Sequence, residues 1–226
     1  MLSRTEYRDP AVARHPAGAP PLKAGHFAGR TVFLLGGGPS LCAGDVALLR
    51  GRPAIAINAA ARWADPTEVL FFRDLEWFVR NRQTVDGWAG LAVTTSRCAV
   101  AHPRLTRAMI VHGADFPAPG LEQGGRPVIR YGRSSGHLAV SLAVAMFARR
   151  VVLLGYDCRF VGGRSHFHDD YAAPIELLYR NDFLPAWRGW GAAAQRVGVE
   201  VLNATVGSAI TEFPFRPLRE LLEGPP

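Results

Sequence analysis

A glycine-rich turn near the start of the chain has the composition of a phosphate-binding loop, and it consists of Gly36, Gly37, Gly38, Pro39 and Ser40. Glycines let backbone N–H groups approach an anion closely, and the N-terminus of a following helix adds unpaired N–H donors and a partial positive charge. The turn is not a P-loop, because no Gly-Lys-Ser/Thr follows. It is not a dinucleotide fingerprint, because the third glycine of that motif is missing. We expect a nucleotide-like phosphate compound here; a tight turn without a ligand is the alternative.

A second segment also combines a polar turn with the start of a helix, and its candidate binding residues are Arg133, Ser134, Ser135 and Gly136. Either serine is a natural N-cap, so a capped helix without a ligand is one interpretation. The other is a second group of hydroxyls and N–H donors, with a guanidinium beside them, at a helix N-terminus. We predict that two helix N-termini, following separate strands, converge on one polyanionic ligand.

Polar side chains also follow three of the expected strands. Asn58 ends the second strand, where an NAD-binding fold usually has an acidic residue for the ribose. Asp74 and Asp157 follow two further strands. Ligands of open α/β sheets bind beyond the carboxyl ends of the strands, so either carboxylate can hold Mg²⁺ or accept a hydrogen bond from a ribose or sugar hydroxyl. Asp74 and Asp157 can each act as a helix N-cap instead.

Two histidines, His166 and His168, stand in a polar loop after Asp157. Histidine titrates near neutral pH, which suits proton abstraction from an acceptor hydroxyl. The same H-x-H spacing suits a metal pair with Asp170 or Cys158 as a third ligand, and surface histidines without a role are the third interpretation. We predict a catalytic base and assign no metal ligand.

Short apolar runs alternate with helical patterns along the chain, which predicts an α/β domain with a Rossmann-like, doubly wound and mostly parallel sheet. Strands are expected at 31–35, 54–58, 69–72, 91–94, 109–111, 151–155 and 199–203. Helices are expected after the glycine turn and at 74–83, 135–149 and 176–197. Residues 116–126 and 158–174 have the composition of loops.

The length of 226 residues is typical of one domain. Residues 1–30, rich in Pro, Ala, Gly and Arg, are interpreted as an N-terminal tail, and residues 31–222 as the nucleotide-binding domain. Three widely spaced cysteines without a C-x-x-C pair predict a reducing, cytoplasmic location. No apolar run reaches the roughly 18 residues of a membrane span. The charged N-terminal segment lacks an apolar region, so we do not expect it to be a secretory signal.

The net charge is +7, and 26 residues are Lys or Arg, all but Lys23 being arginine. A basic balance favours anionic partners such as nucleotides, nucleic acid or acidic lipid. The bias of a GC-rich genome towards arginine codons explains the composition as well. The arginines are scattered rather than clustered, which argues against a nucleic-acid-binding face.

Three motifs in combination resemble a known superfamily. They are G-x-G-P-S-L at 36–41 with Asn58 after the next strand, S-S-G-x-x-A-x-x-L-A at 134–143, and V-V-L-L-G-Y-D at 151–157. The combination resembles the DUF115 (MptE-like) superfamily, which includes many phage and prophage proteins of unknown role, and the bacterial sialyltransferases of glycosyltransferase family 42. The resemblance covers roughly residues 31–215 and implies a Rossmann-like fold.

The sialyltransferase branch implies that residues 36–40 and Asn58 contact the CMP part of a donor and that residues 134–136 form a second donor-binding turn. It also implies a general-base histidine in the loop after Asp157. Gly37 departs from that branch, which typically has Asn there, and the tyrosines that hold the donor phosphate have only Tyr156 and Tyr171 as candidates. The MptE-like branch implies pyrophosphoryl transfer from ATP to a pterin alcohol with Mg²⁺, where Asp74 and Asp157 would matter more than the histidines.

The leading hypothesis is a nucleotide-sugar-dependent glycosyltransferase-like enzyme that transfers a sugar by in-line displacement at the anomeric carbon. His166 or His168 deprotonates the acceptor, and the helix N-termini with Arg133 stabilise the leaving phosphate. The alternatives are a Mg²⁺-dependent pyrophosphokinase that uses ATP, and a non-catalytic phage protein that binds a nucleotide or nucleic acid.

Overall fold

The computed structural model describes residues 25–65, 68–96, 102–113, 115–120, 126–170 and 176–223. The strands of its main sheet are β1 (Thr31–Leu35), β2 (Ala54–Ile57), β3 (Val69–Phe72), β4 (Leu91–Thr94), β5 (Leu105–Arg107), β8 (Arg150–Leu154) and β9 (Glu200–Asn203). They lie in the order β5-β4-β3-β2-β1-β8-β9, and each neighbouring pair is parallel. The expected doubly wound, Rossmann-like α/β class is therefore confirmed.

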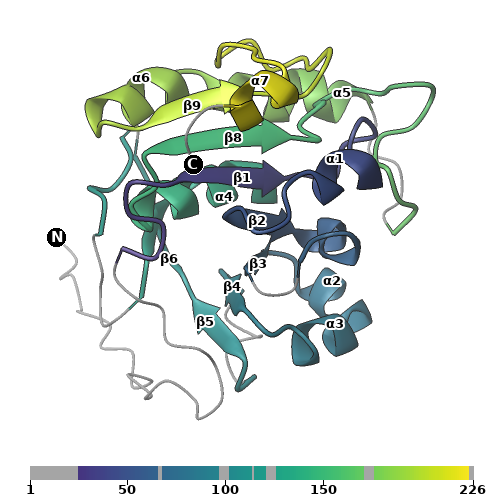
Figure 1. The fold of residues 1–226 in the computed structure, drawn as a ribbon, viewed down its shortest axis with the longest axis vertical. Helices are drawn as coiled ribbons and strands as arrows, with labels where there is room; N and C mark the ends of the chain where they lie inside the picture. The colour runs from purple at the N-terminus through teal and green to yellow at the C-terminus, as the bar shows by residue number, and fades with distance from the viewer. Residues whose placement is uncertain are drawn as a thin grey trace, which may run out of the picture.

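The chain builds one half of the sheet outward from β1 and then returns to the other side of β1. β2 to β5 extend in sequence to one edge, whereas β8 pairs with the free side of β1 and β9 follows it. Figure 1 shows β1 between β8 and β2, with the arrows of β1 and β8 pointing the same way. The switch in strand order lies between β1 and β8, which is where open α/β sheets hold their ligands.

Two short strands were not expected from the sequence. β5 reads Leu-Thr-Arg and lacks an apolar run, and β7 (Val128–Arg130) has only two apolar residues. The expected strand β6 (Met109–Val111) is present, but it pairs with β7 in a separate two-stranded parallel sheet.

The regular helices are α1 (Ala43–Ala47), α2 (Leu75–Arg80), α3 (Arg82–Asp86), α4 (Ser135–Ala145), α5 (Glu176–Leu178), α6 (Trp190–Arg196) and α7 (Leu218–Glu223). Two 3₁₀ turns, η1 (Asn58–Arg62) and η3 (Pro185–Trp187), and one π-helical turn, η2 (Tyr179–Phe183), accompany them. The expected helix at 74–83 is broken at Asn81, and the one at 135–149 ends at Ala145. The one at 176–197 is broken into α5, η2, η3 and α6, where Pro185 lacks an N–H donor and Gly189 has a φ of 75°.

The helix after the glycine turn starts later than the sequence suggested. α1 begins at Ala43, and the Sγ atom of its N-cap Cys42 accepts a hydrogen bond from the Asp45 amide. Pro39 and Ser40 therefore lie in a turn before the helix rather than in its first turn. The N-terminus of α1 does not open at the glycines.

The side chains of each strand alternate between two apolar layers. Val32 and Leu34 pack with α4 and α6 on one face of the sheet, whereas Phe33 and Leu35 pack with α1 and α7 on the other. Farther out on the second face, β3 and β4 pack against α2 and α3. The result is a three-layer sandwich whose central strands are buried on both sides.

The end of the expected N-terminal tail belongs to this body. Phe27 is completely buried in the layer that contains α4, and its amide donates to the carbonyl of Met146. Ala28 forms an antiparallel bridge with Ala148. Residues 1–24 lie outside the described residues.

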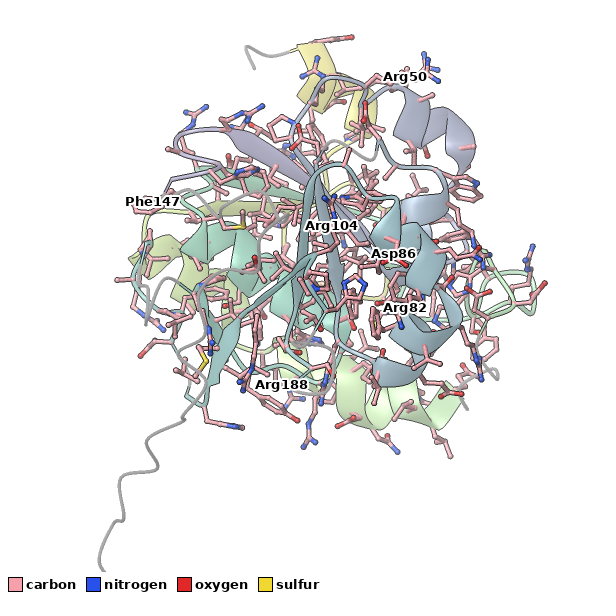
Figure 2. All side chains as sticks on the ribbon, turned by 90° about the horizontal axis from the view of Figure 1, so that it is seen from below. Arg50, Arg82, Asp86, Arg104, Phe147 and Arg188 are labelled. Atoms are coloured by element: carbon pink, nitrogen blue, oxygen red, sulfur yellow. The ribbon has the colours of Figure 1, made fainter. Side chains whose placement is uncertain are left out.

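The described arginines are spread over the molecule. In Figure 2, Arg50 lies near one end of the view and Arg188 near the other, with Arg82 and Arg104 between them. The labelled arginines thus form no single basic face in this view. Within the described ranges, no helix is both long and apolar enough to cross a membrane.

Candidate functional site

A cavity of about 330 Å³ lies at the carboxyl ends of β1, β2, β3 and β8, beside the switch in strand order. The sequence-predicted residues that line it are Gly36, Gly37, Gly38, Asn58, Asp74, Arg133, Ser134, Ser135, Gly136, Tyr156, Asp157, His166 and His168. Pro39 and Ser40 are not part of this lining. Residues spread over 133 positions of the sequence thus meet at one place, although their roles in binding remain predictions.

The glycine turn contacts the loop after β8 more closely than any side chain would allow. A Cβ atom on Gly38 would lie 2.0 Å from the Asp157 carboxylate and 2.5 Å from the Gly155 carbonyl oxygen. A Cβ atom on Gly36 would lie 2.5 Å from the same carbonyl oxygen. Both positions require glycine because two backbone segments pack directly against each other there.

The amides of this turn are largely engaged within the protein. Gly36 donates to the Leu154 carbonyl and Gly38 to the Gly155 carbonyl, each at 2.8 Å. Ser40 donates to the Asp157 carboxylate, through its amide at 3.3 Å and through its hydroxyl at 2.8 Å. The expected cradle of free N–H groups is therefore not formed by Gly36, Gly38 and Ser40, because Leu154, Gly155 and Asp157 already accept their hydrogen bonds.

Asp157 and Asn58 contribute buried oxygen atoms to the site. Asp157 is 1% exposed, and burial raises the pKa of its carboxyl. One carboxylate oxygen faces Ser40, while the other, like the amide oxygen of Asn58, has no hydrogen-bond partner among the described residues. Asn58 has a φ of 51°, a left-handed conformation that asparagine tolerates better than most residues. Unpaired buried oxygens are costly, so both atoms suit a ligand that donates hydrogen bonds.

The N-terminus of α4 differs from the glycine turn. Ser134 is the N-cap, but its side chain does not bind a backbone amide of the helix. Its Oγ atom lies 2.8 Å from Nδ1 of His137 instead. The first amides of a helix have no intrahelical acceptor, and here no side chain caps them, so α4 presents its N-terminal dipole at residues that line the cavity.

His137 anchors this helix start in the core. It is completely buried, and its ring stacks on Trp187 at a centroid distance of 3.7 Å. Burial, with a smaller contribution from the positive charge of Arg130, lowers the pKa of His137 to about 3. The ring is therefore neutral at pH 7 and holds the Ser134 hydroxyl in place.

Arginine side chains provide positive charge at the rim. Arg133 pairs with Asp182 of η2, with 3.1 Å between Nε and the carboxylate. Arg73, which sequence reasoning missed, also lines the cavity, and one of its nitrogens donates to the Gly132 carbonyl at 3.3 Å. Asp74 precedes α2 as its N-cap residue, without a capping hydrogen bond from its side chain.

The loop after β8 carries both predicted histidines into the cavity lining. The Phe167 amide between them donates to the Gly37 carbonyl at 3.1 Å, which fixes the loop on the glycine turn. The ring centroids of His166 and His168 are 5.1 Å apart. Burial is the main cause that lowers the pKa of both, and it lowers that of His166 to about 4. Both rings are therefore neutral at pH 7, the state that a general base requires.

Aromatic residues form the remaining wall of the cavity, and no sequence motif indicated them. Tyr179 and Phe183 are the ends of η2, and Trp187 follows in η3. One regular helix was expected over 176–197, so the turns η2 and η3 and their cavity-lining side chains were not predicted. Trp187 and Trp190 are both buried.

The tyrosines expected at the donor phosphate have a different outcome. The Tyr156 hydroxyl is buried and donates to the Gly136 carbonyl at 3.2 Å, so it links the β8 loop to α4. Burial also raises the pKa of this phenol. Tyr171 lies outside the described residues.

Metal binding by the H-x-H pair finds no third ligand in the described part of the chain. No group of three or more His, Cys, Asp or Glu side chains there has a metal-binding arrangement. Burial raises the pKa of the Cys158 thiol to about 12, and Asp170 is held by Arg62.

Comparison of the chain with family models, with curated proteins and with solved structures gave no match in any of the three. The function must therefore be argued from the site itself.

Proposed function

We propose that this protein is a nucleotide-sugar-dependent glycosyltransferase-like enzyme whose donor binds in the cavity at the carboxyl ends of β1 and β8. The observation that carries the proposal is the meeting, in one cavity, of an uncapped helix N-terminus, two neutral histidines and an aromatic wall. A volume of about 330 Å³ is at the small end of the range for ligand sites.

The phosphate of the donor binds at the N-terminus of α4. The N–H groups at Ser135 and Gly136 and the helix dipole favour an anion there. Arg73 and Arg133 line the same cavity and add positive charge. These groups stabilise the charge that grows on the nucleotide phosphate as it leaves.

The sugar or ribose hydroxyls of the donor have hydrogen-bond acceptors at Asn58 and Asp157, which line the same cavity. The unpaired oxygens of Asn58 and Asp157 accept hydrogen bonds and donate none when Asp157 is ionised. The aromatic rings of Tyr179, Phe183 and Trp187 provide flat apolar surface for a base or sugar ring.

The reaction is a displacement at the anomeric carbon. A histidine of the pair removes the proton from the acceptor hydroxyl, and the acceptor oxygen forms a bond to the anomeric carbon. The bond from that carbon to the phosphate oxygen breaks, and the nucleotide leaves with the electron pair. General-base catalysis of this kind contributes about 10²–10⁴-fold in rate.

A second candidate is Mg²⁺-dependent pyrophosphoryl transfer from ATP. Asp74 and Asp157 line the cavity together, and Mg²⁺ is often held by one or two carboxylates plus substrate phosphates. In that reaction Mg²⁺ would supply charge neutralisation of the transferred phosphates.

Thermal-shift screening separates these candidates. We expect CMP, UDP or GDP to raise the melting temperature without Mg²⁺. A shift that requires both ATP and Mg²⁺ would favour the pyrophosphokinase instead. Absence of a shift with every nucleotide would contradict both enzymatic proposals.

A further inference from the structure

The two histidines of the cavity have different hydrogen-bond partners at the same ring atom. Nδ1 of His168 accepts a hydrogen bond from the backbone amide of Asp170 at 3.2 Å. Nδ1 of His166 lies 3.0 Å from the hydroxyl of Ser165. An amide can only donate, whereas a hydroxyl can donate or accept. The two rings are therefore constrained differently.

The partner of His168 fixes its tautomer. Because Nδ1 uses its lone pair to accept from Asp170, the neutral ring carries its hydrogen on Nε2 and acts there as a donor. His166 has no such constraint from Ser165. It can donate from Nδ1 to the hydroxyl and keep the lone pair on Nε2, which is the atom a general base needs.

A carboxylate that accepted from Nδ1 of His168 would favour the tautomer with its hydrogen on Nδ1. Arg62 binds the nearby Asp170 carboxylate and so competes with this contact. The Asp170 carboxylate lies 3.7 Å from Nδ1 of His168. Arg62 donates to both of its oxygens, at 2.6 and 2.7 Å. Arg80 also donates to the Asp170 carbonyl at 3.0 Å, and Trp63 stacks on Phe167 at 4.1 Å. These contacts hold the histidine loop against η1 and α2.

The Nε2 atom of His168 lies over the glycine turn. It would be 3.5 Å from a Cβ atom on Gly37, and Cδ2 of His166 would be 3.2 Å from the same point. The amide of Gly37 takes part in none of the hydrogen bonds between described residues, in contrast to those of Gly36 and Gly38. The Gly37 amide and Nε2 of His168 are thus two hydrogen-bond donors of residues that line the cavity. The His168 side chain is only 2% exposed, and its lowered pKa keeps the ring neutral.

We propose that His168 is a hydrogen-bond donor to an anionic oxygen of the ligand, that His166 alone is the base, and that Arg62 is the positioning residue that maintains this division. The identity of the anion as the donor phosphate rests on the proposed function. The tautomers of the two histidines do not depend on the proposed function.

Conservative variants of the pair test the division of roles. Glutamine has an N–H donor about as far from the backbone as Nε2 of histidine, but it is not a base. His168→Gln should bind CMP or UDP about tenfold more tightly than His168→Ala, since a hydrogen bond to a charged group has about that value. His166→Gln should lose about 100-fold or more in the release of nucleotide from CMP-sialic acid or UDP-glucose. Equal binding by His168→Gln and His168→Ala, or full turnover by His166→Gln, would overturn the assignment.

Nitrogen-15 NMR of histidine-labelled protein without any ligand reads the tautomers directly. The signals of His166 and His168 are assigned by their loss in the glutamine variants. We expect the hydrogen of His168 on Nε2 at pH 7, and a partial shift to Nδ1 in Arg62→Gln, because the Asp170 carboxylate is then released. A hydrogen on Nδ1 of His168 in the unchanged protein would overturn the proposal, and an unaltered tautomer in Arg62→Gln would overturn the role of Arg62. Failure of the wild-type protein to bind any nucleotide would instead contradict the proposed function and leave the tautomer result standing.

Discussion

The glycine turn at 36–40 and the helix start at 134–136 look alike in the sequence but differ in what their N–H groups do. In the first, the amides of Gly36, Gly38 and Ser40 donate to β8 and to Asp157. In the second, no side chain caps the helix, and Ser134 bonds to His137 instead. Glycines that approach another backbone and glycines that approach a ligand leave the same sequence pattern. Their hydrogen bonds distinguish them.

The two turns line one cavity but supply different groups to it. In the first turn, the amide and the hydroxyl of Ser40 donate to the Asp157 carboxylate, so these two donors are not available to an external anion. The second turn retains its partial positive charge. The start of α4 is therefore the stronger site for a phosphate, and Nε2 of His168 and the Gly37 amide are donors on the glycine-turn side.

Replacing a glycine by alanine in each turn should give the largest difference between them, measured as a loss of folding stability. Gly38→Ala places a Cβ atom 2.0 Å from a buried carboxylate oxygen and 2.5 Å from a backbone oxygen, so we expect a loss of about 3 kcal/mol or more in the free energy of unfolding. Gly136→Ala approaches the Tyr156 ring at 3.0 Å and gains helix propensity, so we expect a change below about 1 kcal/mol. Urea unfolding of both variants measures the contrast, and equal losses would contradict it.

Acid should destabilise the start of α4 through His137. Its pKa is about 3 in the folded protein and roughly 6.5 in an unfolded chain. Between these values the unfolded chain takes up a proton that the folded chain does not. The contribution of the neutral His137 ring to the free energy of unfolding is fully present above about pH 6.5. It falls by about 1.4 kcal/mol for each pH unit below that, or by about 3 kcal/mol at pH 4.

Denaturant unfolding between pH 7 and pH 4 measures this dependence. His137→Gln is the control, because it lacks the titrating group and should show a shallower slope, with the remainder coming from groups such as His166. The prediction fails if the stability of the wild-type protein is flat over this range, or if the variant retains the full slope.

A negative charge at the second turn should separate binding from stability. Ser135→Asp places a carboxylate at the N-terminus of α4, which stabilises the helix by about 0.3–1 kcal/mol but repels the ligand phosphate. We expect about tenfold or greater weakening of CMP or UDP binding, with the uncharged Ser135→Asn as the control of similar shape. Calorimetric titration gives both affinities, and equal affinities would argue against the phosphate position.

Ser40→Ala is the matching change in the first turn. It removes the 2.8 Å hydrogen bond to Asp157, so we expect a loss of about 1–2 kcal/mol in stability. Since Ser40 does not line the cavity, nucleotide affinity should stay within about threefold of the wild-type value. A much larger loss of affinity would indicate that the phosphate binds at the glycine turn instead.

The sequence predicted the framework of the fold because the central strands are buried on both faces. Continuous apolar runs such as 32–35 and 151–154 are characteristic of such strands, and their alternation with helices predicts the sheet. Short edge elements carry no such pattern, so β5 and β7 were missed. The breaks at η2 and η3 were missed because a regular helical period suggested one helix.

Many residues that line the cavity could be predicted from the sequence, but their hydrogen bonds could not. Parallel strands bring their carboxyl ends to one edge, so Asn58, Asp74 and Asp157 could be expected to meet there. Which amides are free depends on contacts such as that between Ser40 and Asp157, more than a hundred positions apart, and no local pattern encodes these. Arg73 was missed because a single arginine after a strand has no distinguishing motif.

Amide chemical-shift changes on addition of CMP or UDP show which of the two turns binds the phosphate. We expect the largest shifts at Ser135, Gly136 and His137, and small shifts at Gly36 and Gly38, whose N–H groups donate to carbonyls of β8 and of the loop after it. The largest shifts at Gly36 and Gly38, with the start of α4 unchanged, would contradict it.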